Sequence, residues 1–111
     1  MGKEKNNYYN GQLRFEGEYL NDRKWTGKGY DILNNLIYEL KDGRGLIKEY
    51  NYDGELEYEG EYKNGKRNGK GKEYYNNNLL FFEGEYLNGQ KNGKGKEYIG
   101  NGQLKYEGEY L

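Results

Sequence analysis

The chain of 111 residues lacks cysteine, histidine and proline, and it also contains no serine, alanine or valine. Without cysteine there is neither a disulfide framework nor a cysteine-based zinc site. The usual catalytic nucleophiles and general bases are missing as well, because they are supplied mostly by serine, cysteine and histidine. We therefore expect a protein that is not an enzyme, with no catalytic residue, no cofactor and no bound metal.

A strong charge of either sign is also lacking. Lysine and arginine together number 18 and the acidic residues 19, so the net charge is −1. Such a balance gives no overall attraction to nucleic acid, and we expect no nucleic-acid partner. No apolar run approaches the roughly 20 residues of a membrane helix, and no apolar segment follows the first residues as in a secretory signal. We expect a cytoplasmic protein, either free or associated with the cytoskeleton or a membrane.

What the chain does contain is glycine and tyrosine, with 19 and 15 residues, on a regular schedule. In residues 56–62 a leucine, two tyrosines and a glycine alternate with glutamates. This period of two predicts a β-strand, because successive side chains of a strand point to opposite faces. The Asn-Gly pairs at 64–65 and 68–69 are expected to bracket a turn, where positive φ angles are cheap. Residues 70–74 would then form the return strand of a hairpin.

Parity assigns the two faces of this hairpin. If Tyr62 lies opposite Gly69, Gly60 lies opposite Gly71, and tyrosines cover glycines on one face. The other face then carries glutamates opposite lysines, and each such pair contributes roughly 0.2–1 kcal/mol. A ring that covers a strand glycine offsets its missing side chain. We expect the rings and the motif leucines on this face to provide most of the apolar burial.

The hairpin recurs along the chain. A degenerate copy of the motif Leu-x-aromatic-x-Gly-x-Tyr begins at Leu36, where Leu40 replaces the glycine. A fixed period of 20 to 24 residues is typical of a repeat array. We predict one array over residues 1–111, with a polar lead-in at 1–12 that adds a partial strand. The full motif begins at Leu13, Leu56, Leu80 and Leu104, so that units start near residues 13, 36, 56 and 80, with a half unit from 104.

These units predict an all-β fold, a single-layer antiparallel meander of stacked β-hairpins with about nine or ten short strands. The result would be an elongated, twisted sheet. An extra residue around Lys24 and Trp25 predicts a β-bulge in the first unit. The half unit that ends at Tyr110 and Leu111 predicts either a fragment of a longer array or an edge strand that pairs with another copy.

Two units, residues 58–71 and 82–95, closely resemble the MORN repeat (membrane occupation and recognition nexus). Each contains an aromatic-x-Gly followed by three glycines at spacings of four and two. Residues 15–29 match with one insertion, the unit from Tyr38 lacks the strand glycine, and residues 106–110 form a front half. The resemblance covers nearly the whole chain.

This resemblance implies a single-layer, twisted and groove-shaped sheet of hairpins. It also implies a mostly non-catalytic role in protein–protein interaction and scaffolding. Several MORN arrays self-associate, and some were proposed to bind phosphoinositide membranes.

The aromatic face is the first candidate site. Its rings are expected to be the core of the sheet, while outer rings and phenol hydroxyls contact a partner, since tyrosine is favoured at interfaces. We expect a partner-binding aromatic groove made of Tyr19, Tyr58, Tyr62, Phe82, Tyr86, Tyr106 and Tyr110. Recognition of a small cation or a glycan by aromatic clefts is a third hypothesis, because ring faces attract cations.

Basic residues near the hairpin turns form the second candidate site. The simpler interpretation is a set of solvated turns balanced by neighbouring glutamates. The alternative is peripheral binding to anionic membranes, in which each well-placed basic residue adds about 1 kcal/mol. The residues concerned are Lys63, Lys66, Arg67, Lys91 and Lys94.

The sequence therefore favours a non-catalytic repeat module for protein–protein interaction and scaffolding. Its partner is a protein of unknown identity, bound through the aromatic groove. The module is also expected to form homo-oligomers through its terminal edge strands.

Overall fold

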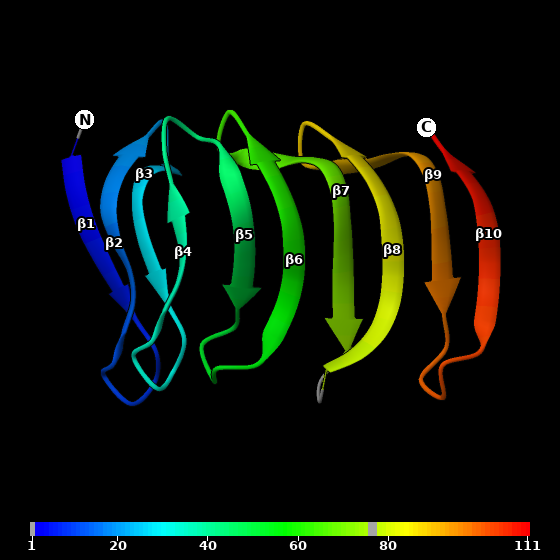
Figure 1. The fold of residues 1–111 in the computed structure, drawn as a ribbon, viewed down its shortest axis with the longest axis horizontal. Coiled ribbons are helices and arrows are strands. Elements are labelled where there is room, and N and C mark those ends of the chain that lie inside the picture. The colour runs from blue at the N-terminus through cyan, green and yellow to red at the C-terminus, as the bar shows by residue number, and fades with distance from the viewer. Residues whose placement is uncertain (1, 76–77) are drawn as a thin grey trace.

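The computed structural model describes residues 2–75 and 78–111, which form β-strands joined by turns and contain no α-helix. The ten strands follow one another in a meander (Figure 1). They are β1 (Gly2–Asn7), β2 (Leu13–Leu20), β3 (Arg23–Tyr30), β4 (Leu36–Leu40), β5 (Gly45–Tyr50), β6 (Leu56–Lys63), β7 (Lys66–Tyr75), β8 (Leu79–Leu87), β9 (Gln90–Tyr98) and β10 (Leu104–Tyr110).

Every strand pairs antiparallel with its neighbour in sequence inside two sheets, one of β1–β4 and one of β5–β10. Figure 1 shows the ends of the chain at opposite ends of the molecule, with β5–β10 side by side as curved strands. The all-β hairpin meander is thus confirmed, as is the partial strand in the lead-in, which is β1. The prediction of one continuous sheet is wrong, because the strands form two sheets that are divided between β4 and β5.

The division follows from two large side chains at positions where other units carry glycine. Leu40 ends β4 in place of the motif glycine, and Ile47 of β5 lies opposite Gly60. Both side chains are buried against the rings of Phe15 and Tyr38. Paired glycines let neighbouring backbones approach closely, whereas these side chains need volume between the sheets. The four residues form a core at the junction of the two sheets.

Tight turns fix the hairpins of the larger sheet. Asn64 and Gly65 have φ angles of 56° and 75°, and Asn88 and Gly89 have 51° and 88°. Two consecutive residues with positive φ are typical of the two-residue turn whose twist matches that of the flanking strands. The Asn-Gly pair at 68–69, which was expected to bracket the turn, lies instead inside β7.

The register of the β6–β7 hairpin is partly as predicted. Gly60 does lie opposite Gly71, but Tyr62 lies opposite Arg67 and not opposite Gly69. The hairpin closes earlier than expected, and the register shifts after Gly60, where Gly69 takes a φ of 100°. Because of this shift Arg67 stands across from a tyrosine, on the aromatic side of the sheet.

The bulge predicted in the first unit is confirmed. Glu18 lies opposite Thr26, whereas the next residue, Tyr19, lies opposite Lys24. Trp25 is the extra residue between these two pairs, as in a β-bulge. The run Asn76-Asn77-Asn78 is also typical of a turn, and its first two residues lie outside the described part of the chain.

The motif leucines contribute less to the core than expected. Leu36 is 50% exposed and Leu104 is 53% exposed. Burial comes mainly from rings, which lie over the glycine row and offset the missing side chains. The buried apolar residues are Tyr8, Phe15, Tyr38, Leu40, Ile47, Tyr58, Phe82 and Tyr86.

The close contact between ring and glycine predicts a sensitivity to Gly71→Ala. A Cβ atom at Gly71 would lie 2.6 Å from Cε1 of Tyr58, which is buried and has no room to move. We expect the free energy of unfolding in urea to fall by about 1–3 kcal/mol. Gly100→Ala is the control, because nothing lies within 4 Å of its Cβ position. Equal stability of the two variants would contradict the proposed packing.

Candidate functional site: a charged groove

An open groove of about 1000 Å³ crosses the larger sheet from β5 to β10. Its floor is a row of glycines that lie opposite one another on successive strands, with Ile47 at the β5 end. Because glycine has no side chain, the backbone itself is the bottom of the groove. The row consists of Gly60, Gly71, Gly84, Gly95 and Gly108.

One wall of the groove is a ladder in which lysine and glutamate alternate from strand to strand. Each residue of this ladder lies directly opposite the next across the sheet. We call it the first ladder. It runs through Lys48, Glu59, Lys72, Glu83, Lys96 and Glu107.

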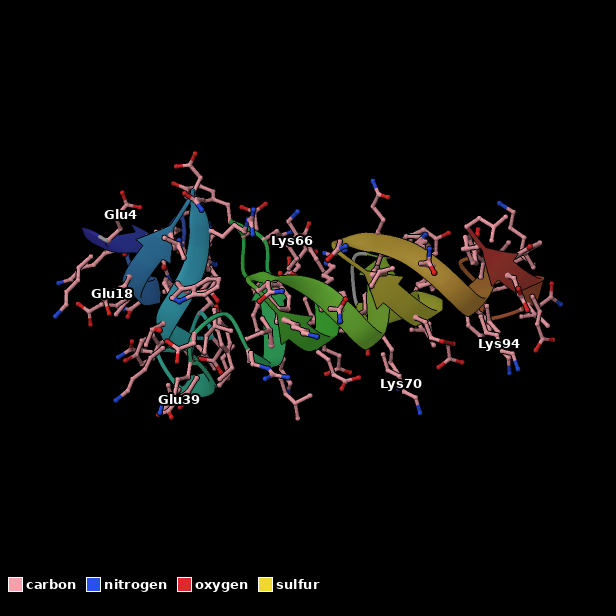
Figure 2. All side chains as sticks on the ribbon, turned by 90° about the horizontal axis from the view of Figure 1, so that it is seen from above. Glu4, Glu18, Glu39, Lys66, Lys70 and Lys94 are labelled. Atoms are coloured by element: carbon pink, nitrogen blue, oxygen red, sulfur yellow. The ribbon has the colours of Figure 1, made fainter. Side chains whose placement is uncertain are left out.

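The second ladder flanks the glycine row on the other side. Lys70 lies opposite Glu85, and Lys94 opposite Glu109. Glu61 completes it on β6, where its carboxylate accepts a hydrogen bond of 2.6 Å from the backbone N–H of Lys70. Figure 2 shows Lys70 and Lys94 on the same side of the ribbon, with Lys66 on the other side.

Taken together, the two ladders give each strand a single charge sign on its groove side. Strands β6, β8 and β10 are acidic there, while β7 and β9 are basic. Strand β5 contributes Lys48 together with the exposed Leu46. The groove face thus carries stripes of alternating charge, one per strand.

Few of the ladder residues form ion pairs with one another. Of the ladder pairs in the described part of the chain, only Lys96 and Glu107 approach within an ion-pair distance, at 3.7 Å. Glu59 and Glu83 accept hydrogen bonds of 2.6 Å from the hydroxyls of Tyr74 and Tyr98, respectively.

None of the predicted aromatic residues lines this charged groove. Those of β6, β8 and β10 lie on the opposite face of the sheet, and Tyr19 belongs to β2 of the smaller sheet. Binding of a partner by these rings stays a prediction. Tyr58, Phe82 and Tyr86 are buried within the protein. Tyr106 is 43% exposed, and the rest of the predicted set, Tyr19, Tyr62 and Tyr110, is half-buried. Alternation is the reason, because the rings share their parity with the glycines and the charged residues do not.

Cations fill the spaces between the rings on this aromatic face. The guanidinium carbon of Arg67 lies 4.1 Å from the ring centre of Tyr58. Its Nε and Nη2 atoms donate hydrogen bonds of 3.0 and 3.2 Å to Glu49. The ammonium of Lys91 lies 4.2 Å from the ring centre of Phe82. Such cation–ring contacts strengthen as water is excluded.

The basic residues proposed for lipid binding therefore lie in different environments. The placement of Arg67 and Lys91 in solvated turns is wrong, since both belong to strands and pack on rings. Lys63 and Lys94 are exposed, and Lys66 is half-buried. These five residues do not form one basic surface.

Sequence reasoning missed the acids of the aromatic face. The hydroxyls of Tyr62, Tyr86 and Tyr110 donate hydrogen bonds to Glu49, Glu73 and Glu97. Each acceptor lies 13 residues before its donor. A signal was present in the triplet Lys-Glu-Tyr, which recurs at 48–50, 72–74 and 96–98.

These contacts shift the ionisation of the groups involved. Burial first, and then the adjacent Glu49 carboxylate, raises the pKa of Tyr62, and burial with Glu73 does the same for Tyr86. Burial alone would lower the pKa of Arg67, but the hydrogen bonds and charge of Glu49 outweigh it and raise that pKa. Both effects favour the observed network of neutral phenols and paired ions.

A smaller pocket of about 360 Å³ lies near the junction of the two sheets. Of the predicted aromatic residues, only Tyr62 lines it. Lys24 also lines it, with its ammonium 5.0 Å from the ring centre of Phe15. Burial, and then the charge of Arg14, lowers the pKa of Lys24.

The described residues carry no sign of a metal centre or a spanning helix. Among them, no group of three or more acidic residues is arranged to hold a metal ion. No helix in residues 2–75 and 78–111 could span a membrane. Within the same ranges, every buried side-chain nitrogen or oxygen has a hydrogen-bond partner. The polar atoms buried on the aromatic face are thus satisfied within the protein.

The buried phenols predict a loss of stability in alkali. A tyrosine with a raised pKa stays protonated in the folded state, while the unfolded chain releases its proton near pH 10. The stabilisation is complete below about pH 10 and is lost as the pH rises through the folded values, such as the pKa of about 12 of buried Tyr8. We expect the free energy of unfolding in urea to fall between about pH 10 and pH 12, and less steeply in Tyr86→Phe. A stability that is constant over this range would contradict the prediction.

Comparison with known proteins agrees with this architecture. The family model of the MORN repeat matches residues 58–79 and 82–104, which cover most of the hairpins β6–β7 and β8–β9. A search of curated proteins finds no match to the chain. MORN repeats are non-enzymatic modules that generally mediate interaction with proteins or membranes. Two matched repeats inside a meander of hairpins show that the chain is a MORN-repeat protein.

Proposed function

We propose that this protein is a non-catalytic interaction module that binds a protein partner along the charged groove of β5–β10. The observation that carries the proposal is the groove itself, about 1000 Å³ in volume and lined by alternating lysines and glutamates above a glycine floor. The opposite face is less suited to binding, because its rings are covered by the protein's own cations and acids.

The spacing of the charge stripes fits a helical segment of the partner better than an extended one. Neighbouring strands lie about 4.8 Å apart, so stripes of one sign repeat at about twice that distance. A helix laid across the strands presents side chains on one face about every 4.5–6 Å. An extended segment presents them about every 6.8 Å and loses register after two strands. A helix with acidic and basic residues on successive turns therefore meets an opposite charge on each strand.

Charge complementarity of this kind supports specificity more than affinity. Most of the ladder charges are exposed, so replacing their water by a partner's charges gains little free energy. Like charges brought together cost several kcal/mol, which rejects wrong partners. The glycine floor also lets a partner come close to the backbone of the sheet, because no side chain stands in between. We infer an interface that selects partners by the order of their charges.

Two alternatives have less support. Peripheral binding to anionic membranes loses Arg67 and Lys91, which are engaged with rings and acids. Recognition of a ligand cation by ring faces is weakened by the same contacts, since the faces of Tyr58 and Phe82 already carry cations.

Designed peptides test the groove. Two 18-residue helical peptides of one composition serve as probes, one with Glu and Lys alternating on successive turns of one face, the other with Glu in one half and Lys in the other. We expect the alternating peptide to bind about tenfold more tightly in fluorescence anisotropy at low salt, since every turn meets an opposite charge.

A groove variant and a matched control complete this experiment. Lys70→Glu with Lys94→Glu should abolish the preference, because the second ladder then becomes acidic on every strand from β6 to β10 and the alternation is lost. Lys41→Glu with Lys63→Glu makes the same change of net charge at exposed positions outside the groove and should preserve it. Equal binding of the two peptides, or no binding of either, would argue against the groove as a protein-binding site.

Vesicle co-sedimentation tests the membrane alternative. With net charge −1 and only scattered free lysines, we expect no more protein on phosphoinositide-containing vesicles than on neutral phosphatidylcholine vesicles at about 0.15 M salt. Binding that is salt-sensitive and lost in Lys63→Glu with Lys66→Glu would instead favour the membrane.

A further inference from the structure

The smaller pocket, at the junction of the two sheets, is built differently from the charged groove. We propose that it binds a small organic dianion from solution, such as an aromatic dicarboxylate or a phosphate monoester. The pocket is lined by residues of β2–β6 and of the adjoining turns, and it shares only Ile47 and Lys48 with the groove. The proposal therefore concerns a second ligand and goes beyond the protein-binding function proposed above.

Two half-buried cations of this pocket have no carboxylate partner. Lys24 of β3 and Arg14 of β2 both line it, and neither forms an ion pair in the described part of the chain. Arg14 is held by neutral oxygens. Its Nε donates a hydrogen bond of 3.1 Å to the side-chain oxygen of Asn6, and its Nη1 donates one of 3.2 Å to the carbonyl of Tyr50. The guanidinium is thus oriented, but its charge is not neutralised.

These two cations also act on each other. Burial, and then the charge of Arg14, lowers the pKa of Lys24, and the opposite effect of Glu49 is smaller than either. The far side of the Lys24 ammonium faces the ring of Phe15 and not water, at 5.0 Å from the ring centre. Two like charges that are partly removed from water destabilise the free protein, and an anion bound beside both of them relieves this repulsion.

The half-buried acid of the pocket is already engaged. The two carboxylate oxygens of Glu49 accept hydrogen bonds of 3.0 and 3.2 Å from Nε and Nη2 of Arg67. The hydroxyl of Tyr62 donates a further hydrogen bond of 2.5 Å to one of these oxygens. The charge of Glu49 is therefore balanced by Arg67, and this acid does not neutralise the two cations of the pocket.

The remaining charges of the lining balance one another. Arg23 and Lys48 are basic, while Asp22 and Glu57 are acidic and exposed. After this balance, and after that of Glu49 with Arg67, two positive charges are left over. A ligand with two negative charges matches this excess better than a ligand with one.

The size and the tyrosines of the pocket fit a small molecule with a flat body. A volume of about 360 Å³ lies at the lower end of the range of ligand pockets, about 300–1,000 Å³. The hydroxyl of Tyr38 makes no hydrogen bond to the described residues, although every fully buried polar atom there has a partner. It is therefore reached through the pocket and can donate to an anion. Flat apolar surface comes from the other tyrosines of the lining, Tyr8, Tyr30, Tyr50 and Tyr62.

Three aromatic probes of similar shape test the number of charges. Phthalate carries two carboxylates, benzoate one and benzamide none. In isothermal titration calorimetry at about pH 7.5 and about 50 mM salt, we expect phthalate to bind at least tenfold more tightly than benzoate, and benzamide not to bind. Phenyl phosphate should bind like phthalate and compete with it. Equal binding of the three aromatic probes, or no binding of either dianion, would overturn the proposal.

A charge variant with a matched control locates the site. Lys24→Gln removes one of the two charges, so it should weaken phthalate at least tenfold and bring its affinity close to that of benzoate. Lys28→Gln makes the same change of net charge at an exposed position of the same strand outside the pocket and should leave binding unchanged. Tyr38→Phe removes only a hydroxyl and should weaken phthalate about tenfold, even if Lys24→Gln does not fold, which circular dichroism detects. Unchanged affinity in Tyr38→Phe and in folded Lys24→Gln would overturn the proposal.

Vesicles distinguish a soluble ligand from a lipid headgroup. We expect phosphoinositide-containing vesicles not to displace phthalate. Vesicle binding that is lost in Lys24→Gln, with neither soluble dianion bound, would assign the pocket to a membrane and overturn the proposal. The groove is tested separately, since Lys70→Glu with Lys94→Glu should bind phthalate like the wild type, and Lys24→Gln should keep the preference for the alternating peptide.

Discussion

The structure depends on aromatic rings lying over a row of paired glycines. A single-layer sheet has no second layer to cover it, so its apolar burial has to come from side chains that fold back onto the sheet itself. Tyr58 and Phe82 do this, lying over Gly71 and Gly95 and buried completely. The glycines are needed because any side chain there would occupy the space of the ring. Where Leu40 and Ile47 stand at the equivalent positions, the sheet divides in two.

This packing also explains why charged residues occur on both faces. On the aromatic face the gaps between rings of successive units are filled by Arg67 and Lys91, which are held by acids such as Glu49 and Glu73. These ions are partly buried and paired with one another, so they stabilise the fold. On the reverse, the ladder residues have water on one side and few ion pairs of their own. The same residue types therefore stabilise the fold on one face and, as we propose, recognise a partner on the other.

The hairpin meander could be read from the residues, because alternation with a period of two and the Asn-Gly turns are local signals. The pairing of Gly60 with Gly71 and the bulge at Trp25 were predicted on the same basis and are observed. The position of Arg67 could not be read in this way. It depends on whether Asn64-Gly65 or Asn68-Gly69 forms the turn, and both pairs tolerate positive φ. Once the first pair forms it, Arg67 moves from a loop to the aromatic face.

By itself, the sequence determined the strands, their antiparallel order and the separation of rings from the ladder charges, since all three follow from parity along a strand. Only the tertiary structure decided which face is hollow. A row of glycines is open on both faces of the sheet until rings fold over one face. Which face the rings cover depends on contacts between residues of different strands. The groove is therefore on the charged side, where lysines and glutamates flank the glycine row and no ring covers it.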